Sequence, residues 1–163
     1  MLDNIKVAFI DLDGTLLNSK SEFSDKTKRV IKLTTEKNIK VVLCSGRSNI
    51  DLISKSKNIN SSSINISSNG ATVYDYLENR VIYENIIEKS ILNEIWNFAM
   101  HNNISLAFNT ILKRYKNANS SKDAVVIKSI DEINENVSQI VIEAKEFNDI
   151  CKMRDFLRDY HDL

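Results

Sequence analysis

The sequence has no excess of charge of either sign, no long apolar run and few cysteines. Its 163 residues carry 22 basic and 22 acidic side chains, with no basic run of five or more, so nucleic acid and anionic membranes find no electrostatic attraction. The longest nearly apolar run, residues 7–10, is far too short to span a bilayer. The N-terminus also lacks the pattern of a signal peptide. We therefore expect a cytoplasmic protein that binds neither nucleic acid nor membrane.

The two cysteines and two histidines have no partner at the spacing of a disulfide framework or a metal site. Cys44 lies in an apolar run, which is typical of a small buried residue. Proline is absent altogether, and we infer no function from this. The length allows one ordinary domain, or a small domain that carries an inserted second one.

The first 70 residues alternate between apolar strands and amphipathic helices. Strands are predicted at residues 6–12, 39–44 and 64–66, and helices at residues 25–37 and 49–57. Two successive right-handed crossovers predict a parallel sheet with helices on both faces. The fold class expected from this order is α/β, with a three-layer, Rossmann-like core.

The pattern changes after the third strand. Residues 71–76 and 80–84 predict a hairpin, and residues 87–102 an amphipathic helix. The elements predicted beyond it are strands at 105–109, 112–117, 124–127 and 138–144, a polar loop at 118–123 and a helix at 147–160. We therefore divide the chain into a core, residues 1–80, and a mixed α/β insert, residues 81–163.

Three of the predicted strands end in polar turns that contain glycine, at residues 11–15, 45–47 and 69–70. The carboxyl ends of parallel strands lie side by side, so these turns can converge on one site. Asp11 is a fixed carboxylate that can attack a phosphorus atom, and Asp13 can protonate the leaving oxygen and then activate water. A solvated turn rich in acids is the alternative reading of this pair.

The other residues of the three turns can contact a phosphate. Gly14 lets the backbone turn its N–H groups toward the phosphate, and Thr15 and Ser45 offer hydroxyl groups. Gly46 allows a close approach, and Asn69 can contact the phosphate or the substrate beyond it. Two interpretations of Arg47 remain open: a phosphate contact, or a surface cation at the start of a helix.

These motifs resemble the haloacid dehalogenase superfamily of phosphatases, in its Cof-type branch. Asp-Leu-Asp-Gly-Thr-Leu-Leu (11–17) matches the first motif of the family at every position. Val-Val-Leu-Cys-Ser-Gly-Arg (41–47) looks like the second motif, and Ile-Ser-Ser-Asn-Gly-Ala (66–71) is similar to the signature of the third strand. Residues 81–85 and the helix after them resemble the start of the α/β cap domain of this branch.

The resemblance implies a Mg²⁺-dependent hydrolase of small phosphorylated metabolites, such as sugar phosphates, that acts through an aspartyl-phosphate intermediate. Asp11 would be the nucleophile and Asp13 the general acid and base. Mg²⁺ would bind the Asp11 carboxylate and the Asp13 backbone carbonyl. The residues expected to contact the phosphate or substrate are Leu12, Gly14, Thr15, Ser45, Gly46, Arg47 and Asn69.

Two parts of the family pattern are missing. The family has a lysine after the cap that neutralises the phosphate, and a Gly-Asp-x-x-Asn-Asp segment that completes the Mg²⁺ shell. This sequence contains no Gly-Asp pair and no glycine beyond residue 70, so it resembles an enzyme truncated within its cap. One carboxylate and one carbonyl bind Mg²⁺ weakly, and an uncompensated carboxylate attacks a phosphate dianion poorly.

Two functions therefore remain open from the sequence. The chain is either a hydrolase, as part of a longer or split enzyme, or an inactive truncated fragment or phosphate-binding module. A signalling receiver domain is excluded, because the third predicted strand ends in Ser67, Ser68 and Asn69 instead of an aspartate. Without further strands beside it, the first strand would be an exposed apolar edge that favours a homodimer or a complementing C-terminal fragment.

Overall fold

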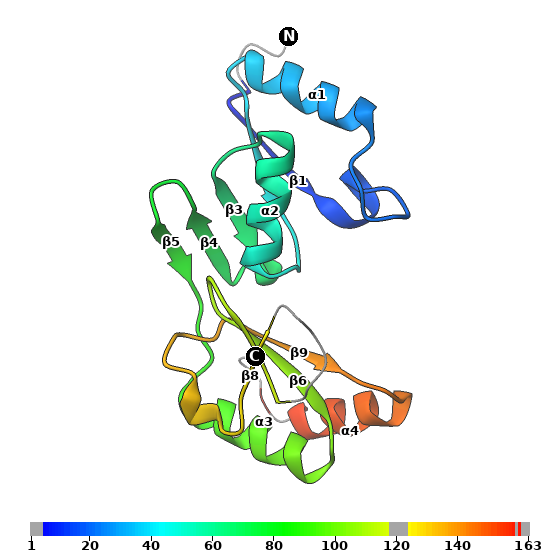
Figure 1. Ribbon diagram of the computed structural model, residues 1–163, viewed down its shortest axis with the longest axis vertical. Helices are drawn as coiled ribbons and strands as arrows, with labels where there is room; N and C mark the ends of the chain where they lie inside the picture. Colours follow the sequence, from blue (N-terminus) through cyan, green and yellow to red (C-terminus); the bar gives the residue numbers. More distant parts are fainter. Residues whose placement is uncertain (1–4, 118–123, 159, 161–163) are drawn as a thin grey trace. The chain divides into compact units, whose positions relative to one another are not determined.

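The computed structural model describes residues 5–117, 124–158 and 160, and its contacts divide the chain into two compact units (Figure 1). Unit 1 comprises Met1–Asn85 and unit 2 comprises Ile86–Leu163. A boundary after residue 80 would detach strand β5 (Arg80–Glu84) from strand β4 (Thr72–Asp75), with which it pairs. The division falls after Asn85 because this hairpin belongs to the sheet of unit 1. The predicted loop at residues 118–123 lies outside the described residues.

Unit 1 is a five-stranded sheet whose first three strands are joined by two helices. Strands β1 (Val7–Asp11), β2 (Lys40–Cys44) and β3 (Ile64–Ser67) are parallel, and helices α1 (Asp25–Glu36) and α2 (Asn49–Ile59) connect them. The hairpin β4–β5 continues the sheet with antiparallel pairing, in the order β1-β2-β3-β4-β5. The predicted α/β, Rossmann-like class is confirmed.

Both helices of unit 1 begin at a serine that caps the first turn. The Ser24 hydroxyl accepts a hydrogen bond from the Thr27 N–H (3.1 Å), and the Ser48 hydroxyl accepts one from the Asp51 N–H (3.4 Å). The second cap matters for the site, because Ser48 follows directly after Arg47. The start of α2 therefore fixes the path of the polar turn between β2 and α2.

One hydrophobic cluster anchors these turns. Its members come from α1, β2 and α2, and from the turn after β1; they include Ile31, Val41, Leu43, Leu52, Ile59 and Leu12. Leu12 is fully buried, and burying a leucine side chain contributes about 2 kcal/mol. It holds the turn after β1 on the core while its neighbours Asp11 and Asp13 remain exposed.

Strand β1 is the outer strand of the sheet, since among the described residues it pairs with β2 alone. Phe9 is 65% exposed, and Val7 and Ile5 are exposed as well. The apolar edge that the sequence predicted at this strand is therefore present. An edge of this kind can accept another strand.

Unit 2 is a four-stranded sheet packed against two helices. The strand order is β8-β7-β6-β9. The elements are α3 (Lys89–His101), β6 (Ser105–Asn109), β7 (Arg114–Lys116), β8 (Val125–Val126), β9 (Gln139–Glu143) and α4 (Phe147–Leu157). Leu106, Phe108 and Met153 are fully buried in its core, together with Ile95 and Trp96 of α3. Across the part of the chain that the structure describes, no helix is long and apolar enough to cross a membrane.

Candidate active site

The first polar turn begins at Asp11, the last residue of β1. Residues Leu12–Leu16 form a tight turn, which is closed by a backbone hydrogen bond from the Leu17 N–H to the Leu12 carbonyl oxygen (3.0 Å). Inside this turn Asp13 has extended backbone angles (φ −80°, ψ 121°) and Gly14 has a φ of 80°. Apart from Gly14 itself and its two neighbours in the chain, no heavy atom of the described residues lies within 4 Å of the place where a Cβ of Gly14 would be. Glycine is therefore favoured here by its positive φ and not by lack of space.

Hydrogen bonds join the ends of the three parallel strands. Asp11 lies opposite Cys44 in the register of β1 and β2. The Ser45 N–H donates to the Ile66 carbonyl oxygen (3.0 Å), and the Asn69 N–H donates to the Ser45 carbonyl oxygen (3.2 Å). These contacts bring residues 11–15, 45–47 and 69–70 to one edge of the sheet.

Gly46 and Asn69 are in direct contact within this group of turns. A Cβ on Gly46 would lie 2.5 Å from the Oδ1 atom of Asn69, a distance that real Cβ atoms do not adopt. Asn69 has little freedom to move away with its backbone, since its φ is 56° and its N–H is bonded to Ser45. Glycine at position 46 therefore makes room for the amide of Asn69.

If the chain hydrolyses phosphate esters, as the sequence predicts, replacing Gly46 with alanine is expected to displace the Asn69 side chain and to lower kcat/KM by about 10- to 100-fold, the loss that a small misplacement of a binding group produces. The measurement is steady-state kinetics, with thermal unfolding to confirm that the variant folds. Asn69→Ala is the matched control: adding Gly46→Ala to it should cost little more. Two losses that simply multiply would show that Gly46 acts by another route.

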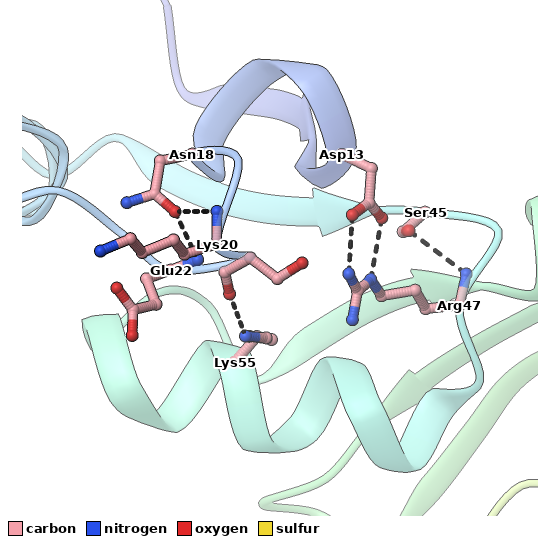
Figure 2. Close-up of polar contacts among 8 residues, drawn as sticks. Asp13, Asn18, Lys20, Glu22, Ser45, Arg47 and Lys55 are labelled. Atoms are coloured by element: carbon pink, nitrogen blue, oxygen red, sulfur yellow. Dashed lines mark hydrogen bonds and ion pairs between the residues drawn. The ribbon is translucent and has the colours of Figure 1, made fainter.

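Asp13 is held by Arg47, which lies in the second turn (Figure 2). The Arg47 Nε donates to Oδ2 of Asp13 at 2.8 Å, and an Arg47 Nη donates to Oδ1 at 2.7 Å. The hydrogen bonds from Arg47, aided by the charges of Arg47 and Lys55, hold the pKa of the Asp13 carboxyl below its usual value. Arg47 is thus engaged with a predicted catalytic acid, an arrangement that neither interpretation of Arg47 from the sequence included.

Ser45 is nearly buried beside this pair. Its hydroxyl oxygen accepts a hydrogen bond from the Arg47 backbone N–H at 3.2 Å. The nearby Ser45 side chain also helps to lower the pKa of the Asp13 carboxyl. A phosphoryl oxygen that reached Ser45 would therefore enter a cluster in which Asp13 and Arg47 already take part.

The remaining residues predicted to contact phosphate differ in what they can offer. The side chain of Leu12 is buried in the core, so only its backbone is available. Gly14, Thr15 and Asn69 are exposed at the turns.

Cys44 lies at the end of β2, opposite Asp11. It is partly buried, and burial, together with the nearby charge of Asp11, raises the pKa of its thiol.

Lys55 of α2 is a cation near the site that the sequence analysis did not identify. Its Nζ donates to the Ser21 carbonyl oxygen at 2.8 Å, and its charge helps to lower the pKa of Asp13 (Figure 2). Lysines are common on helix surfaces, so no local pattern distinguishes this one. Only the direction of α2, which runs from the second polar turn, places Lys55 close to Asp13.

The first turn offers oxygen donors to a divalent cation. The Asp11 carboxylate is exposed, and the backbone carbonyl of Asp13 follows two residues later; such hard oxygen ligands suit Mg²⁺. The Asp13 carboxylate is engaged by Arg47. Within residues 5–117, 124–158 and 160, no three His, Cys, Asp or Glu side chains are grouped so as to hold a metal ion. The residues fit Mg²⁺ in donor type and would supply part of its shell.

A Rossmann-like core with paired acids directly after its first strand defines the class of this protein: an α/β domain whose site lies at the carboxyl ends of parallel strands. The model of the haloacid dehalogenase-like hydrolase family matches residues 8–163. The chain belongs to this family.

Individual relatives agree with this assignment. Phosphatase YwpJ of Bacillus subtilis is 28% identical in an alignment of 145 residues that covers 79% of this chain and 50% of that protein. The 5-amino-6-(5-phospho-D-ribitylamino)uracil phosphatase YcsE of the same organism is 26% identical over 113 residues, which are 69% of this chain and 45% of that protein. A solved haloacid dehalogenase-like hydrolase from Bacteroides thetaiotaomicron has a TM-score of 0.83 at 20% identity, covering 94% of this chain and 63% of that chain. The chain spans about half the length of these curated relatives.

Proposed function

We propose that the protein hydrolyses phosphate monoesters of small metabolites, such as sugar phosphates, with Asp11 as the nucleophile. The observation that carries this proposal is the pair of acids on one tight turn, Asp11 exposed and Asp13 fixed, beside Ser45 and Asn69. Membership of a hydrolase family and the relatives named as phosphatases support it. The named substrate of one relative, a phosphorylated ribityl compound, is of the same chemical class.

Two displacements at phosphorus account for the reaction. A carboxylate oxygen of Asp11 attacks phosphorus, the bond from phosphorus to the ester oxygen breaks, and Asp13 gives that oxygen a proton, so the alcohol leaves. Water then attacks the phosphorus of the aspartyl phosphate while Asp13 takes a proton from the water, and the bond to Asp11 breaks. The products are the alcohol and inorganic phosphate, and both carboxyl groups return to their starting states.

The ion pair of Asp13 with Arg47 affects the protonation state of Asp13, which differs between the two displacements. The hydrogen bonds from Arg47 lower the pKa of Asp13 and so favour its deprotonated form, which can accept a proton as the second displacement requires. The first displacement requires the protonated form. In that form one Asp13 oxygen carries the proton for the leaving group, and the other can still accept a hydrogen bond from Arg47.

Mg²⁺, when held by the Asp11 carboxylate and the Asp13 carbonyl, would neutralise charge on the phosphoryl group. The Ser45 hydroxyl and the turn residues Gly14, Thr15, Gly46 and Asn69 would contact the phosphoryl oxygens or the substrate, as would the backbone of Leu12. The positive charge of Lys55 would offset part of the charge that accumulates when a carboxylate approaches a phosphate.

A second function, binding of a phosphorylated ligand without turnover, is favoured by two observations. The Asp13 carboxylate is already paired, and the described residues hold no group of three side chains suited to a metal ion. The chain would then act as a phosphate-binding module, or need a further polypeptide for activity. The exposed edge of β1 would accept such a polypeptide, or a second copy of the chain, as an added strand.

The purified protein is expected to release inorganic phosphate from p-nitrophenyl phosphate and from a panel of sugar phosphates when Mg²⁺ is present, and EDTA is expected to abolish the release. Calorimetric titration with inorganic phosphate on the same preparation separates the two functions. Binding without release would support the phosphate-binding module and would contradict hydrolysis by this chain. Release that EDTA does not affect would contradict the role of Mg²⁺.

A further inference from the structure

The contact between Arg47 and Asp13 is a two-point contact. Two different nitrogen atoms of the guanidinium reach two different oxygen atoms of the carboxylate, at 2.8 and 2.7 Å. Such a fork fixes the plane of the carboxyl group as well as its position, which a single hydrogen bond does not. The geometry therefore restrains the rotation of the Asp13 side chain.

The backbone of Arg47 is itself held on both sides. Its N–H donates to the Ser45 hydroxyl at 3.2 Å, and its carbonyl oxygen accepts a hydrogen bond from the Ser68 N–H at 2.9 Å. The next residue, Ser48, is the buried cap of α2. Arg47 thus extends from a fixed point that is linked to both β3 and α2.

Asp13 has fewer restraints of its own. It lies on a turn with extended backbone angles, and its side chain is 53% exposed, against 29% for Arg47. An exposed aspartate on such a turn would sample several rotamers. The restraint on its carboxylate comes from the second turn, through the two hydrogen bonds of Arg47.

We propose that Arg47 is a positioning residue that orients the carboxyl group of Asp13 for proton transfer, and not a residue that binds the substrate phosphate. This inference rests on the proposed hydrolase function. A lysine at this position would keep the positive charge but could not form the fork. The substitution Arg47→Lys therefore tests the geometry of the contact with Asp13 separately from the positive charge.

Arg47→Lys and Arg47→Ala are both expected to lower kcat by about 10- to 100-fold, the usual cost of losing a group that orients a functional side chain, while KM changes by less than about threefold. Arg29→Lys, an exposed arginine of α1, is the matched control and should leave both constants unchanged. In a protein that carries Asp13→Ala, the further change Arg47→Ala should cost little, because the group to be oriented is gone. A raised KM with unchanged kcat, or full activity in Arg47→Lys, would overturn the proposal.

A second measurement does not depend on turnover. The NMR signal of the Arg47 Nε–H, assigned by its loss in Arg47→Lys, should be slow to exchange with solvent in the parent protein. It should exchange fast in Asp13→Ala and be unchanged in Asp11→Asn. A signal that Asp13→Ala leaves unaltered would overturn the proposal. If the parent shows no turnover that depends on Asp11, the hydrolase function fails, and this measurement still decides whether Arg47 orients Asp13.

Discussion

Asp11→Asn is expected to reduce phosphate-ester hydrolysis by more than about 10⁴-fold, the scale on which removal of a catalytic nucleophile acts. The amide has nearly the shape of the carboxylate but no charged oxygen that can attack phosphorus. It also removes the one carboxylate that the turn leaves available to Mg²⁺. The fold should be unaffected, because Asp11 is exposed at the end of β1 and contributes nothing to the hydrophobic cluster.

The measurement is release of inorganic phosphate at saturating Mg²⁺, with thermal unfolding of each variant. Asp25→Asn, an exposed acid in the first turn of α1, makes the same chemical change away from the site and should retain activity. A hydroxylamine-labile phosphoryl group, trapped on the parent by rapid acid quench, should be absent from Asp11→Asn. Turnover that persists in Asp11→Asn would rule out the aspartyl-phosphate mechanism.

Asp13→Ala is expected to have the second-largest effect, a loss of about 10²- to 10⁴-fold, which is the usual contribution of general acid and base catalysis. The loss should depend on the leaving group. On the proposed mechanism, the poor leaving group of a sugar phosphate would need a proton from Asp13, whereas p-nitrophenolate would depart with little help. The defect should therefore be larger for a sugar phosphate than for p-nitrophenyl phosphate.

The control for Asp13→Ala addresses the cation that it leaves behind. Arg47 loses its carboxylate partner in this variant, so Asp13→Asn, which keeps an oxygen acceptor for Arg47, is measured beside it. Both variants should show the same dependence on the leaving group. A uniform loss on all substrates would indicate that Asp13 maintains the turn and does not transfer a proton.

The elements of unit 1 could be predicted because each has a local signal. Strand β2 is an apolar run that ends in a polar turn, and α1 begins at a serine whose hydroxyl caps the helix. The hairpin of β4 and β5 was also expected from its sequence. The contacts divide the units after Asn85, whereas the sequence predicts a boundary at residue 80; the difference comes from the pairing of β5 with β4, which no change of composition marks.

The candidate site was also predictable only in part. The sequence predicted which residues belong to it, because polar residues follow the strand ends: Asp11, Asp13, Ser45 and Asn69. Which of these residues contact each other did not follow. The close packing of Asn69 on Gly46 and the nearness of Lys55 to Asp13 depend on how separate turns meet, and no short stretch of sequence contains both members of either pair.

The sequence by itself determined which side chains stand at the carboxyl ends of β1, β2 and β3, because apolar runs alternating with polar turns set the order and type of the elements. Only the tertiary structure decided that the guanidinium of Arg47 lies on the carboxylate of Asp13, 34 residues away in the chain. The physical reason is that this contact requires the parallel register of β1 with β2, the anchoring of Leu12 in the core and the cap of α2 at Ser48, all together. Packing of the whole unit sets these distances.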